Sequence, residues 1–314
     1  MNNLKIDRET IIVSDTHFKH SNITKFEPIR AEEMKKKGYE TYENLFDSKE
    51  YKIPRRINHD KWLIELWNEN VKPNQVVLHM GDFAFGLTFD NPELIRVFEA
   101  LAPNGFSKKK LKKELEKLSP KELKDLYKID ITKVSSPKEN KDIKAFKKII
   151  LDYLPESEIF TRYSDVLNGN IILVLGNHDV KQSNNNYGDI KVIKGFYDMD
   201  KKIFDIKNDY LFSGFTKTMN NKKIMFCHYP LFDTDNEYPR KNKRLNTRVE
   251  KLEELYKSTN CEYVIHGHAH SNTCTFKDSY NTSIEVNRKI KSTKSTKSTS
   301  ALGFIKIGNI LDNI

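Results

Sequence analysis

The stretch "IILVLGNHD" at residues 171–179 joins a run of aliphatic residues directly to four residues that rarely belong in a protein interior. A short aliphatic run bounded in this way is typical of a buried strand. Gly176 and Asn177 suit a turn that ends such a strand, but a turn has no need of His178 and Asp179. We therefore expect the strand to hold these polar groups in fixed positions at its carboxyl end.

The same pattern occurs four more times along the 314-residue chain. Aliphatic residues are followed at once by Asp or His in "TIIVSDTH" (10–17), "QVVLHMGD" (75–82), "KKIMFCHYP" (222–230) and "YVIHGHAH" (263–270). In open α/β sheets, ligand sites form just beyond the carboxyl ends of the strands. We therefore expect the five strand ends to bring their polar side chains to one rim.

Helical and hairpin patterns complete the predicted fold. "NHDKWLIELWNENV" (58–71) has a helical period, with Asn58 as a natural N-cap and a shared apolar face at Leu63, Leu66 and Trp67. Asn220-Asn221 is typical of a hairpin turn, because Asn tolerates positive φ. Together with a last strand in "LGFIKIGNI" (302–310), these elements predict an α/β fold, with two packed mixed sheets flanked by helices, as a single domain over 1–314.

A Lys-rich segment interrupts this pattern. Residues 101–150 contain 15 Lys and 7 Asp or Glu, so they carry +8 (15 − 7) of the chain's formal net charge of +10. "SPKE" occurs at 119–122 and at 136–139, and each copy has the residues of a helix start. We interpret 101–165 as a helical insertion whose Lys residues form a solvated face; a surface for an anionic partner is the alternative. The low-complexity tract "KSTKSTKST" predicts a loop at about 290–300.

Composition points to a cytoplasmic protein. Three cysteines without C-x-x-C spacing indicate a reducing compartment. No run approaches the roughly 18 apolar residues of a membrane span, and the N-terminus lacks the pattern of a signal peptide.

The polar groups at the strand ends have the chemistry of a metal centre. Carboxylates, imidazoles and one amide oxygen suit Mn²⁺, Fe or Zn²⁺, and no thiolate lies among them. We expect Asp15 and His17 to lie on the same side of an extended segment, and likewise His268 and His270. Two ions about 3.5–4 Å apart need a shared ligand, which Asp82 can supply. Glycines beside the ligands would allow the close backbone approach that a crowded centre requires.

The ordered blocks D-x-H, G-D, G-N-H-D, H and G-H-x-H resemble those of the calcineurin-like metallophosphoesterase superfamily. "SDTHFKHSNITKFE" and "WNENVKPNQVVLHMGDFAFG" are similar to segments of small phosphoesterases predicted in bacteria and bacteriophages, which would place the chain in a bacterial cytoplasm. The resemblance covers about residues 10–90 and 171–287. It implies the superfamily's four-layer sandwich and hydrolysis of a phosphate ester, with a phosphodiester favoured, by a hydroxide that two divalent transition metal ions activate (Mn²⁺ favoured; Fe, Zn²⁺ or Ni²⁺ as alternatives).

Carried over by position, the resemblance divides the side chains into two metal groups and a catalytic pair. One ion would take Asp15, His17 and His270, the other would take Asn177, His228 and His268, and Asp82 would bridge them. His178 would act as the catalytic acid, and Asp179 would orient its imidazole. His266, which precedes the last block, is interpreted as structural.

The departures from the family pattern bear on the substrate. The Ser/Thr protein phosphatases of this superfamily carry an Arg shortly after G-D and end the third block in Glu, whereas this chain has "GDFAFG" and "GNHD". A nucleotide, a cyclic nucleotide or a nucleic acid is therefore expected as the substrate. His20, Asn22 and Arg30 could reach a phosphate or simply form a hydrated loop. A nuclease that holds its substrate with the basic insertion, and a non-catalytic scaffold on the same fold, are the alternative functions.

Overall fold

The computed structural model describes residues 5–43, 52–85, 162–179, 187–207, 212–231, 243–272, 276–286 and 302–314. Nearly all of the predicted 101–165 insertion, including both "SPKE" helices, lies outside these residues, as does the predicted KST loop. The last residues of the predicted insertion, from Arg162, are described, and they lead into the short helix α8 (Tyr163–Val166).

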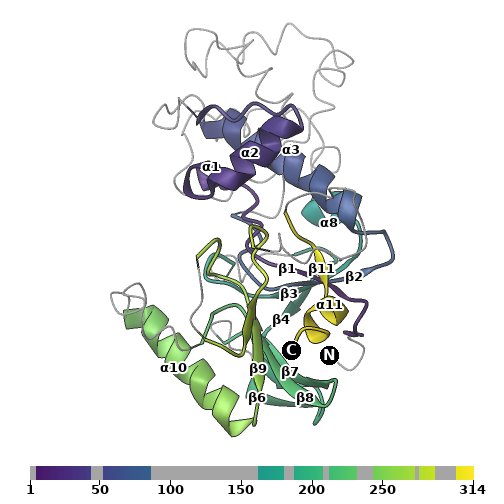
Figure 1. The fold of residues 1–314 in the computed structure, drawn as a ribbon, viewed down its shortest axis with the longest axis vertical. Coiled ribbons are helices and arrows are strands. Elements are labelled where there is room, and N and C mark those ends of the chain that lie inside the picture. The colour runs from purple at the N-terminus through teal and green to yellow at the C-terminus, as the bar shows by residue number, and fades with distance from the viewer. Residues whose placement is uncertain are drawn as a thin grey trace, which may run out of the picture.

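Two mixed β-sheets form the centre of the fold (Figure 1). The first has the order β11-β1-β2-β3-β4, in which only β11 is antiparallel to its neighbour. The second has the order β10-β9-β8-β7-β5-β6 and mixes parallel with antiparallel pairs. The strands of the first sheet are β1 (Ile11–Val13), β2 (Val76–His79), β3 (Asn170–Val174), β4 (Lys191–Ile193) and β11 (Ile305–Lys306). Those of the second are β5 (Gly195–Asp198), β6 (Ile203–Lys207), β7 (Gly214–Met219), β8 (Lys222–Cys227), β9 (Tyr263–His266) and β10 (Ser279–Asn281).

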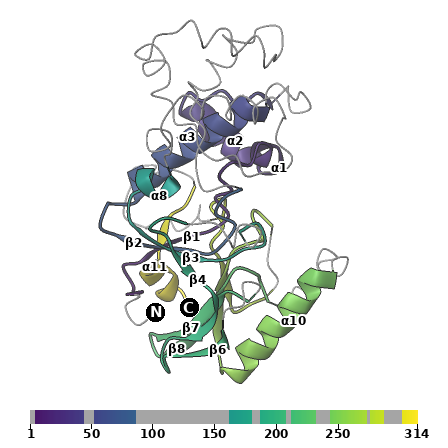
Figure 2. The same ribbon diagram turned by 180° about the vertical axis from the view of Figure 1, so that it is seen from behind.

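Helices flank the two sheets, as the sequence predicts. Figures 1 and 2 show α1, α2, α3 and α8 gathered at one end of the molecule and α10 at the other. Besides α8, the helices are α1 (Ile23–Phe26), α2 (Pro28–Lys36), α3 (Lys52–Asn70), α10 (Lys243–Ser258) and α11 (Ile307–Leu311). None of the described helices combines the length and the apolar content needed to cross a bilayer.

The alternation of side chains along the strands explains the layers. In β1, Ile11 and Val13 pack with Trp62 and Trp67 in the cluster between the first sheet and α3, whereas Ile12 faces the second sheet. In β8, the two faces alternate in the same way, so the second sheet contacts the first on one face and α10 on the other. β1 and the second half of β8 are therefore buried on both faces, which is why apolar residues follow one another there without alternation.

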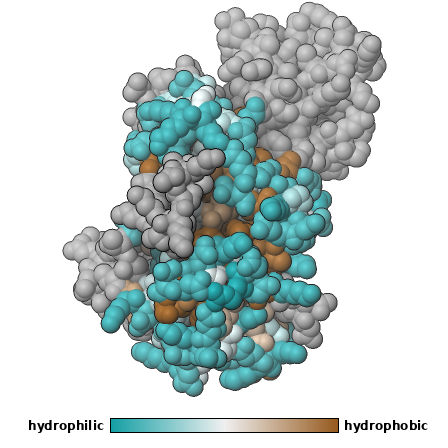
Figure 3. Space-filling view, turned by 45° about the vertical axis from the view of Figure 1, so that its right-hand side comes forward, coloured by the Kyte–Doolittle hydropathy of each residue, from teal (hydrophilic) through white to brown (hydrophobic). Residues whose placement is uncertain are grey.

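Most of the described surface in Figure 3 is hydrophilic, with hydrophobic residues gathered toward the middle of that face. Among the described residues, the large hydrophobic side chains that are exposed are those of Phe26, Ile203 and Phe204. The apolar residues of the five aliphatic runs are thus buried in the core.

All five predicted strands are present, and the hairpin is confirmed. Asn220 and Asn221 have φ values of 49° and 61° and connect β7 to β8 through the pair Met219 and Lys222. One local prediction is wrong, and another is confirmed over only two residues. Helix α3 begins at Lys52, so Asn58 lies inside it and donates to the Glu40 carbonyl (2.9 Å) instead of capping. The last strand is only β11, because the chain turns into α11 at Ile307.

Candidate metal centre

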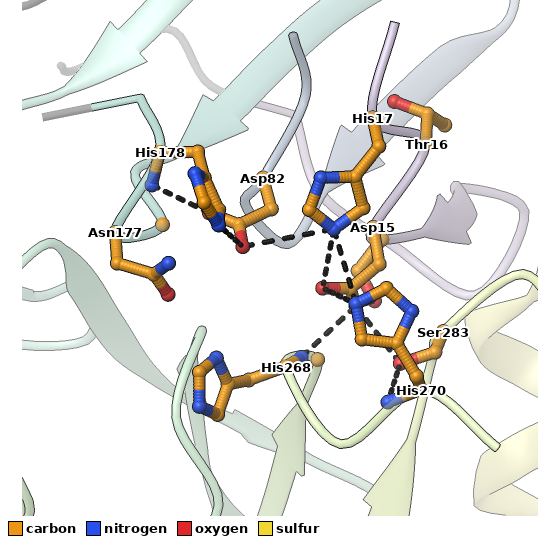
Figure 4. A network of polar contacts seen from close by, with 12 residues as sticks. Asp15, Thr16, His17, Asp82, Asn177, His178, His268, His270 and Ser283 are labelled. Carbon is orange, nitrogen blue, oxygen red and sulfur yellow. Dashed lines mark hydrogen bonds and ion pairs between the residues drawn. The ribbon is translucent and has the colours of Figure 1, made fainter. Parts of the chain in front are cut away.

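The polar residues that follow β1, β2, β3, β8 and β9 converge on one place, as the sequence predicts (Figure 4). Three of these strands belong to the first sheet and two to the second. Backbone hydrogen bonds continue beyond the strand ends: Asp15 N–H donates to Gly81 O (2.9 Å), His17 N–H to Asp82 O (3.0 Å), and Gly267 N–H to His228 O (2.9 Å). Neighbouring ligand loops are therefore joined by backbone hydrogen bonds, as the strands of a sheet are.

Five of the predicted ligands have left-handed backbone conformations. Their φ values are 57° at Asp15, 53° at His17, 53° at Asp82, 66° at His268 and 49° at His270. The prediction that D-x-H and H-x-H are extended segments is therefore wrong, since β geometry requires negative φ. Non-glycine residues seldom adopt this region, and such strain gathers at functional sites, where the surrounding structure enforces it.

The glycines beside the ligands lie so close to other groups that a side chain at these positions would collide with them. A Cβ on Gly81 would lie 2.5 Å from His228 Nδ1, and one on Gly176 would lie 2.3 Å from Asp82 Oδ1. A Cβ on Gly267 would lie 2.8 Å from Asp15 Oδ2. The expectation that these glycines allow close approach to the ligands is confirmed.

Asp15, His17 and His270 form the first group that could hold an ion. The two Nε2 atoms of His17 and His270 are 3.0 Å apart, and they lie 3.9 Å and 3.8 Å from Asp15 Oδ1. The other carboxylate oxygen, Asp15 Oδ2, accepts hydrogen bonds from Ser14 Oγ (2.5 Å), Ser283 Oγ (2.8 Å) and His268 N–H (2.9 Å). One oxygen of Asp15 is thus fully used in fixing the carboxylate, and the other faces the two imidazoles.

Asp82, His228 and His268 form the second group. Asp82 Oδ2 lies 3.5 Å from His228 Nε2, and the rings of His228 and His268 are 5.1 Å apart between centroids. Asn177 Oδ1 lies 3.3 Å from the same His228 nitrogen, so the predicted amide ligand joins this group. His268 and His270 therefore point to different groups, as the resemblance implies.

Asp82 lies between the two groups. The same oxygen that contacts His228 is 3.8 Å from His17 Nε2 and 3.8 Å from His178 Nε2. The other oxygen, Oδ1, accepts a hydrogen bond from His178 N–H (2.9 Å). One carboxylate oxygen is thus available to both groups, which is the position of a bridging ligand.

The Asp82 carboxylate and the His228 imidazole favour each other's charged forms. Burial alone would lower the pKa of His228, but Asp82 raises it to about 9. Burial alone would raise the pKa of Asp82, but His228 and His17 hold it well below its usual range. Burial, followed by the charge of His228, lowers the pKa of His268 to about 3. A proton on His228 therefore supplies the positive charge that the Asp82 carboxylate requires, at a position where a cation would do the same.

Among His17, His178, His228 and His270, His178 has the most exposed side chain. Its side chain is 31% exposed, against 4% for His17 and 0% for His228. Its ring contacts Phe85, with centroids 4.5 Å apart. His178 also belongs to a third potential ligand group with His17 and Asp82, so the geometry permits it to act as a ligand or as an acid.

Asp179 binds the backbone of two ligand loops. Its Oδ1 accepts from Phe83 N–H (3.0 Å) and its Oδ2 from Gly176 N–H (2.9 Å), so both oxygens bind backbone groups. The side chain therefore fastens the loop after β2 to the loop after β3. That Asp179 also orients the His178 imidazole stays a prediction. Burial, with the nearby charge of Asp82, raises the pKa of Asp179 to about 7.

Arg30 and Asn22 are occupied by other partners, whereas the ring of His20 lies 5.7 Å from that of His17. Arg30 is completely buried and pairs with Glu285. Asn22 Oδ1 accepts from Arg55 (3.1 Å), and His20 Nδ1 accepts from Asn22 N–H (3.2 Å). His266 is buried, and its Nδ1 pairs with Gly267 O (2.8 Å), in agreement with a structural role.

Sequence reasoning missed Ser283 and Glu285. Ser283 holds Asp15, and Glu285 Oε1 lies 3.4 Å from His270 Nδ1. Both sit in "SIEV" (283–286), which carries no ligand pattern and follows no predicted strand. The pairing of Ser14 with Ser283, together with the pairing of β10 with β9, brings this segment to the centre.

The donor set fits divalent transition metal ions. Asp15 Oδ1 and His268 Nε2 are buried and have no hydrogen-bond partner among the described residues. Buried polar atoms are seldom left unpaired, and each such atom requires an explanation. Two imidazole nitrogens facing a carboxylate oxygen, with no thiolate, suit Mn²⁺, Fe or Zn²⁺.

Comparisons with known proteins leave the function open. No protein-family model matches the chain, and no curated protein is significantly similar to it. One crystal structure, of a protein of unknown function from Aquifex aeolicus, is similar at 22% identity over 88% of this chain and 89% of that chain, with a TM-score of 0.40. This likeness is too weak to support an assignment.

Proposed function

We propose that this chain is a metal-dependent phosphoesterase that holds two divalent ions and hydrolyses a phosphodiester. The position of Asp82 is the observation that carries the proposal. Its Oδ2 lies 3.8 Å from His17 Nε2 and 3.5 Å from His228 Nε2, so one oxygen serves two groups of ligands. A shared carboxylate is what two ions about 3.5–4 Å apart require.

The residues have separate roles in this proposal. Two groups would each hold one ion, and Asp82 would contact both: Asp15, His17 and His270 on one side, and Asn177, His228 and His268 on the other. Mn²⁺ is the favoured ion, with Fe, Zn²⁺ or Ni²⁺ as alternatives that the same donors accept. When bound, the ions would polarise a phosphoryl oxygen and make a water molecule acidic enough to act near neutral pH.

His178 is assigned the proton transfer. Its side chain is more exposed than that of His270 (31% against 20%), and a leaving oxygen needs a proton as its bond to phosphorus breaks. The Asp82 contact to the His178 N–H fixes the backbone that carries the ring. Asp179 supports the same loop by binding Gly176 N–H.

The surroundings of His178 favour a diester over a monoester. The Phe85 ring lies beside those of His17, His20 and His178, with centroids 4.5–5.8 Å apart. The His20 ring also lies beside that of His17. The guanidinium of Arg30, which could have balanced the second charge of a monoester, is committed to Glu285 and to backbone carbonyls. A singly charged diester, such as a dinucleotide, a cyclic nucleotide or a nucleic acid, therefore suits this rim better.

A substrate panel with Mn²⁺ tests the proposal. The purified chain should contain close to two transition metal ions and hydrolyse bis-p-nitrophenyl phosphate faster than p-nitrophenyl phosphate. Cyclic and linear dinucleotides, and single- and double-stranded nucleic acids, extend the panel. Fewer than one ion per chain, together with no Mn²⁺-dependent hydrolysis, would show that the chain is not this enzyme.

A nuclease is the second candidate, because residues 101–150 carry most of the net charge. Neutralised phosphates make binding strongly dependent on salt. Cleavage of nucleic acid should then fall steeply between 50 and 200 mM salt. Deletion of 105–160 should abolish that cleavage and preserve turnover of bis-p-nitrophenyl phosphate; equal losses of both activities would remove the nuclease proposal.

A further inference from the structure

Arg30 of α2 is completely buried beneath the centre, where its donors reach several different elements. Its Nη1 donates to Thr16 O (2.7 Å) and its Nη2 donates to Asp15 O. Its Nε donates to Glu285 Oε1 (2.7 Å). A buried guanidinium is costly unless its planar fork is well paired, and here the pairs include the backbone of the first ligand block.

Glu285 continues this network to a predicted ligand. Its Oε1 lies 3.4 Å from His270 Nδ1, and the opposite nitrogen of that ring faces His17 Nε2 at 3.0 Å and Asp15 Oδ1 at 3.8 Å. A carboxylate that accepts a hydrogen bond from one imidazole nitrogen leaves the other nitrogen free to bind a metal, and it fixes the orientation of the ring. Glu285 therefore favours the tautomer in which His270 Nδ1 carries the proton and Nε2 offers its lone pair to a metal.

The same residues could be taken for a third ion site, since Glu27, His270 and Glu285 place ligand atoms close together. Arg30 argues against that reading, because its guanidinium already lies against the Glu285 carboxylate. The positive charge that an ion would bring to this trio is supplied by the protein itself.

We propose that Arg30 and Glu285 are positioning residues of the metal centre. Arg30 holds the backbone of Asp15 and Thr16, and Glu285 orients the ring of His270. The ion pair between Arg30 and Glu285 joins the two segments that supply the first ion group. Neither residue touches the substrate or an ion in this proposal. The inference rests on the proposed dinuclear function.

Glu285→Gln is the decisive variant. The amide keeps the size and one acceptor, but it can turn an N–H group toward His270 Nδ1 and so favour the wrong tautomer. Removal of such a partner typically weakens metal binding roughly 10–100-fold. In calorimetric titration of the full-length chain with Mn²⁺, one of the two ions should bind more weakly by that factor, and the other should bind as in the wild-type protein.

Two further variants separate positioning from general loss of stability. Arg30→Lys keeps the charge but cannot span Glu285 and both carbonyls, so it should weaken the same ion. Asp198→Asn is the matched control, because Asp198 is a buried carboxylate that pairs with Lys223 (2.9 Å) and contacts none of the predicted ligands. It should lower the melting temperature and leave both Mn²⁺ affinities unchanged.

The outcomes distinguish this inference from the proposed function. Wild-type binding of two ions, with unchanged affinities in folded Glu285→Gln, would overturn the positioning role and leave the phosphoesterase standing. Three ions in the wild-type chain and two in the variant would instead make the trio an ion site. Absence of any Mn²⁺ binding by the wild-type chain would refute the proposed function itself. A changed absorption spectrum of the Co²⁺-loaded variant, at full occupancy, would support positioning directly.

Discussion

The carboxylates of Asp82 and Asp179 each accept a hydrogen bond from the loop that carries the other. Asp82 Oδ1 accepts from His178 N–H (2.9 Å), and Asp179 Oδ1 accepts from Phe83 N–H (3.0 Å). The loops after β2 and β3 are therefore locked together in both directions. The position of Asp82 between the two groups of imidazoles depends on this reciprocal arrangement.

Replacement of His178 should separate chemistry from metal binding. His178→Ala removes the ring but keeps the backbone N–H that binds Asp82. We expect turnover to fall about 10²–10⁴-fold, as is typical for loss of a general acid, with nearly unchanged metal content. Asp82→Asn should lose both metal and turnover, because the shared ligand is weakened. Metal analysis alongside hydrolysis of bis-p-nitrophenyl phosphate checks both; loss of metal in His178→Ala would identify His178 as a ligand.

Replacement of Asp179 tests whether it acts on the loops or on the His178 ring. Asp179→Asn turns one N–H group toward the N–H of Gly176 or Phe83, so one hydrogen bond is lost. We expect the free energy of unfolding to fall by about 1–3 kcal/mol, with a smaller loss of turnover than in His178→Ala. Urea denaturation and initial rates measure the two effects. A loss of turnover equal to that of His178→Ala, at unchanged stability, would restore the direct orienting role.

Two glycines with similar backbones provide a matched test of crowding at the centre. Gly81 and Gly38 both have positive φ, 95° and 82°, but only Gly81 lies against other groups. Gly81→Ala should displace the His228 ring, which its Cβ would approach to 2.5 Å, and should therefore reduce metal content. Gly38→Ala, with nothing within 4 Å, should cost only about 1 kcal/mol of backbone strain. Equal metal contents in the two variants would contradict this expectation.

Acid should remove the contribution of Asp198 to stability. Burial alone would raise its pKa, but the Lys201 N–H and the Lys223 ammonium hold it below the usual value. A carboxyl group whose pKa is lower in the folded chain stabilises the fold above its unfolded pKa and loses this effect as pH falls through the folded value. The stability difference between the wild-type protein and Asp198→Asn should therefore be about 1–3 kcal/mol at pH 7 and shrink below about pH 4.

Urea denaturation of the chelator-treated proteins between pH 7 and pH 3 measures that difference. Glu254→Gln is the exposed control, because its pair with Lys251 lies in solvent and should contribute less than about 1 kcal/mol at any pH. A difference for Asp198→Asn that stays constant down to pH 3 would mean that the carboxylate is not the source of the stabilisation.

The sequence predicted the parts of this molecule that depend on local pattern. Aliphatic runs identified β1, β2, β3, β8 and β9, and the polar residue types after them identified the side chains that the structure gathers into groups able to hold an ion. Asn220-Asn221 identified the hairpin, because a two-residue turn with positive φ is a local property.

Features that depend on distant partners could not be predicted in this way. The pair of Arg30 and Glu285 spans 255 positions, and nothing near either residue marks it. The hydrogen bond from Phe83 N–H to Asp179 Oδ1 joins residues 96 positions apart, and the sequence around Asp179 does not mark it. The left-handed conformations of Asp15 and His268 also left no trace, since both residue types occur as readily in extended segments. Asn58 misled because a good capping residue is equally able to bind a neighbouring carbonyl from within a helix.

The division of each ligand group between two sheets has a consequence for the whole polymer. His17 and His270 are separated by 253 positions along the chain, and their nitrogens are 3.0 Å apart. An ion held there would act as a reversible cross-link that closes a ring of most of the chain, and long rings restrict the unfolded ensemble most. Thermal resistance should then become a titratable property that rises with the logarithm of free metal concentration once that concentration exceeds the dissociation constant. In a cell, the supply of the metal would set the lifetime of the protein as well as its activity.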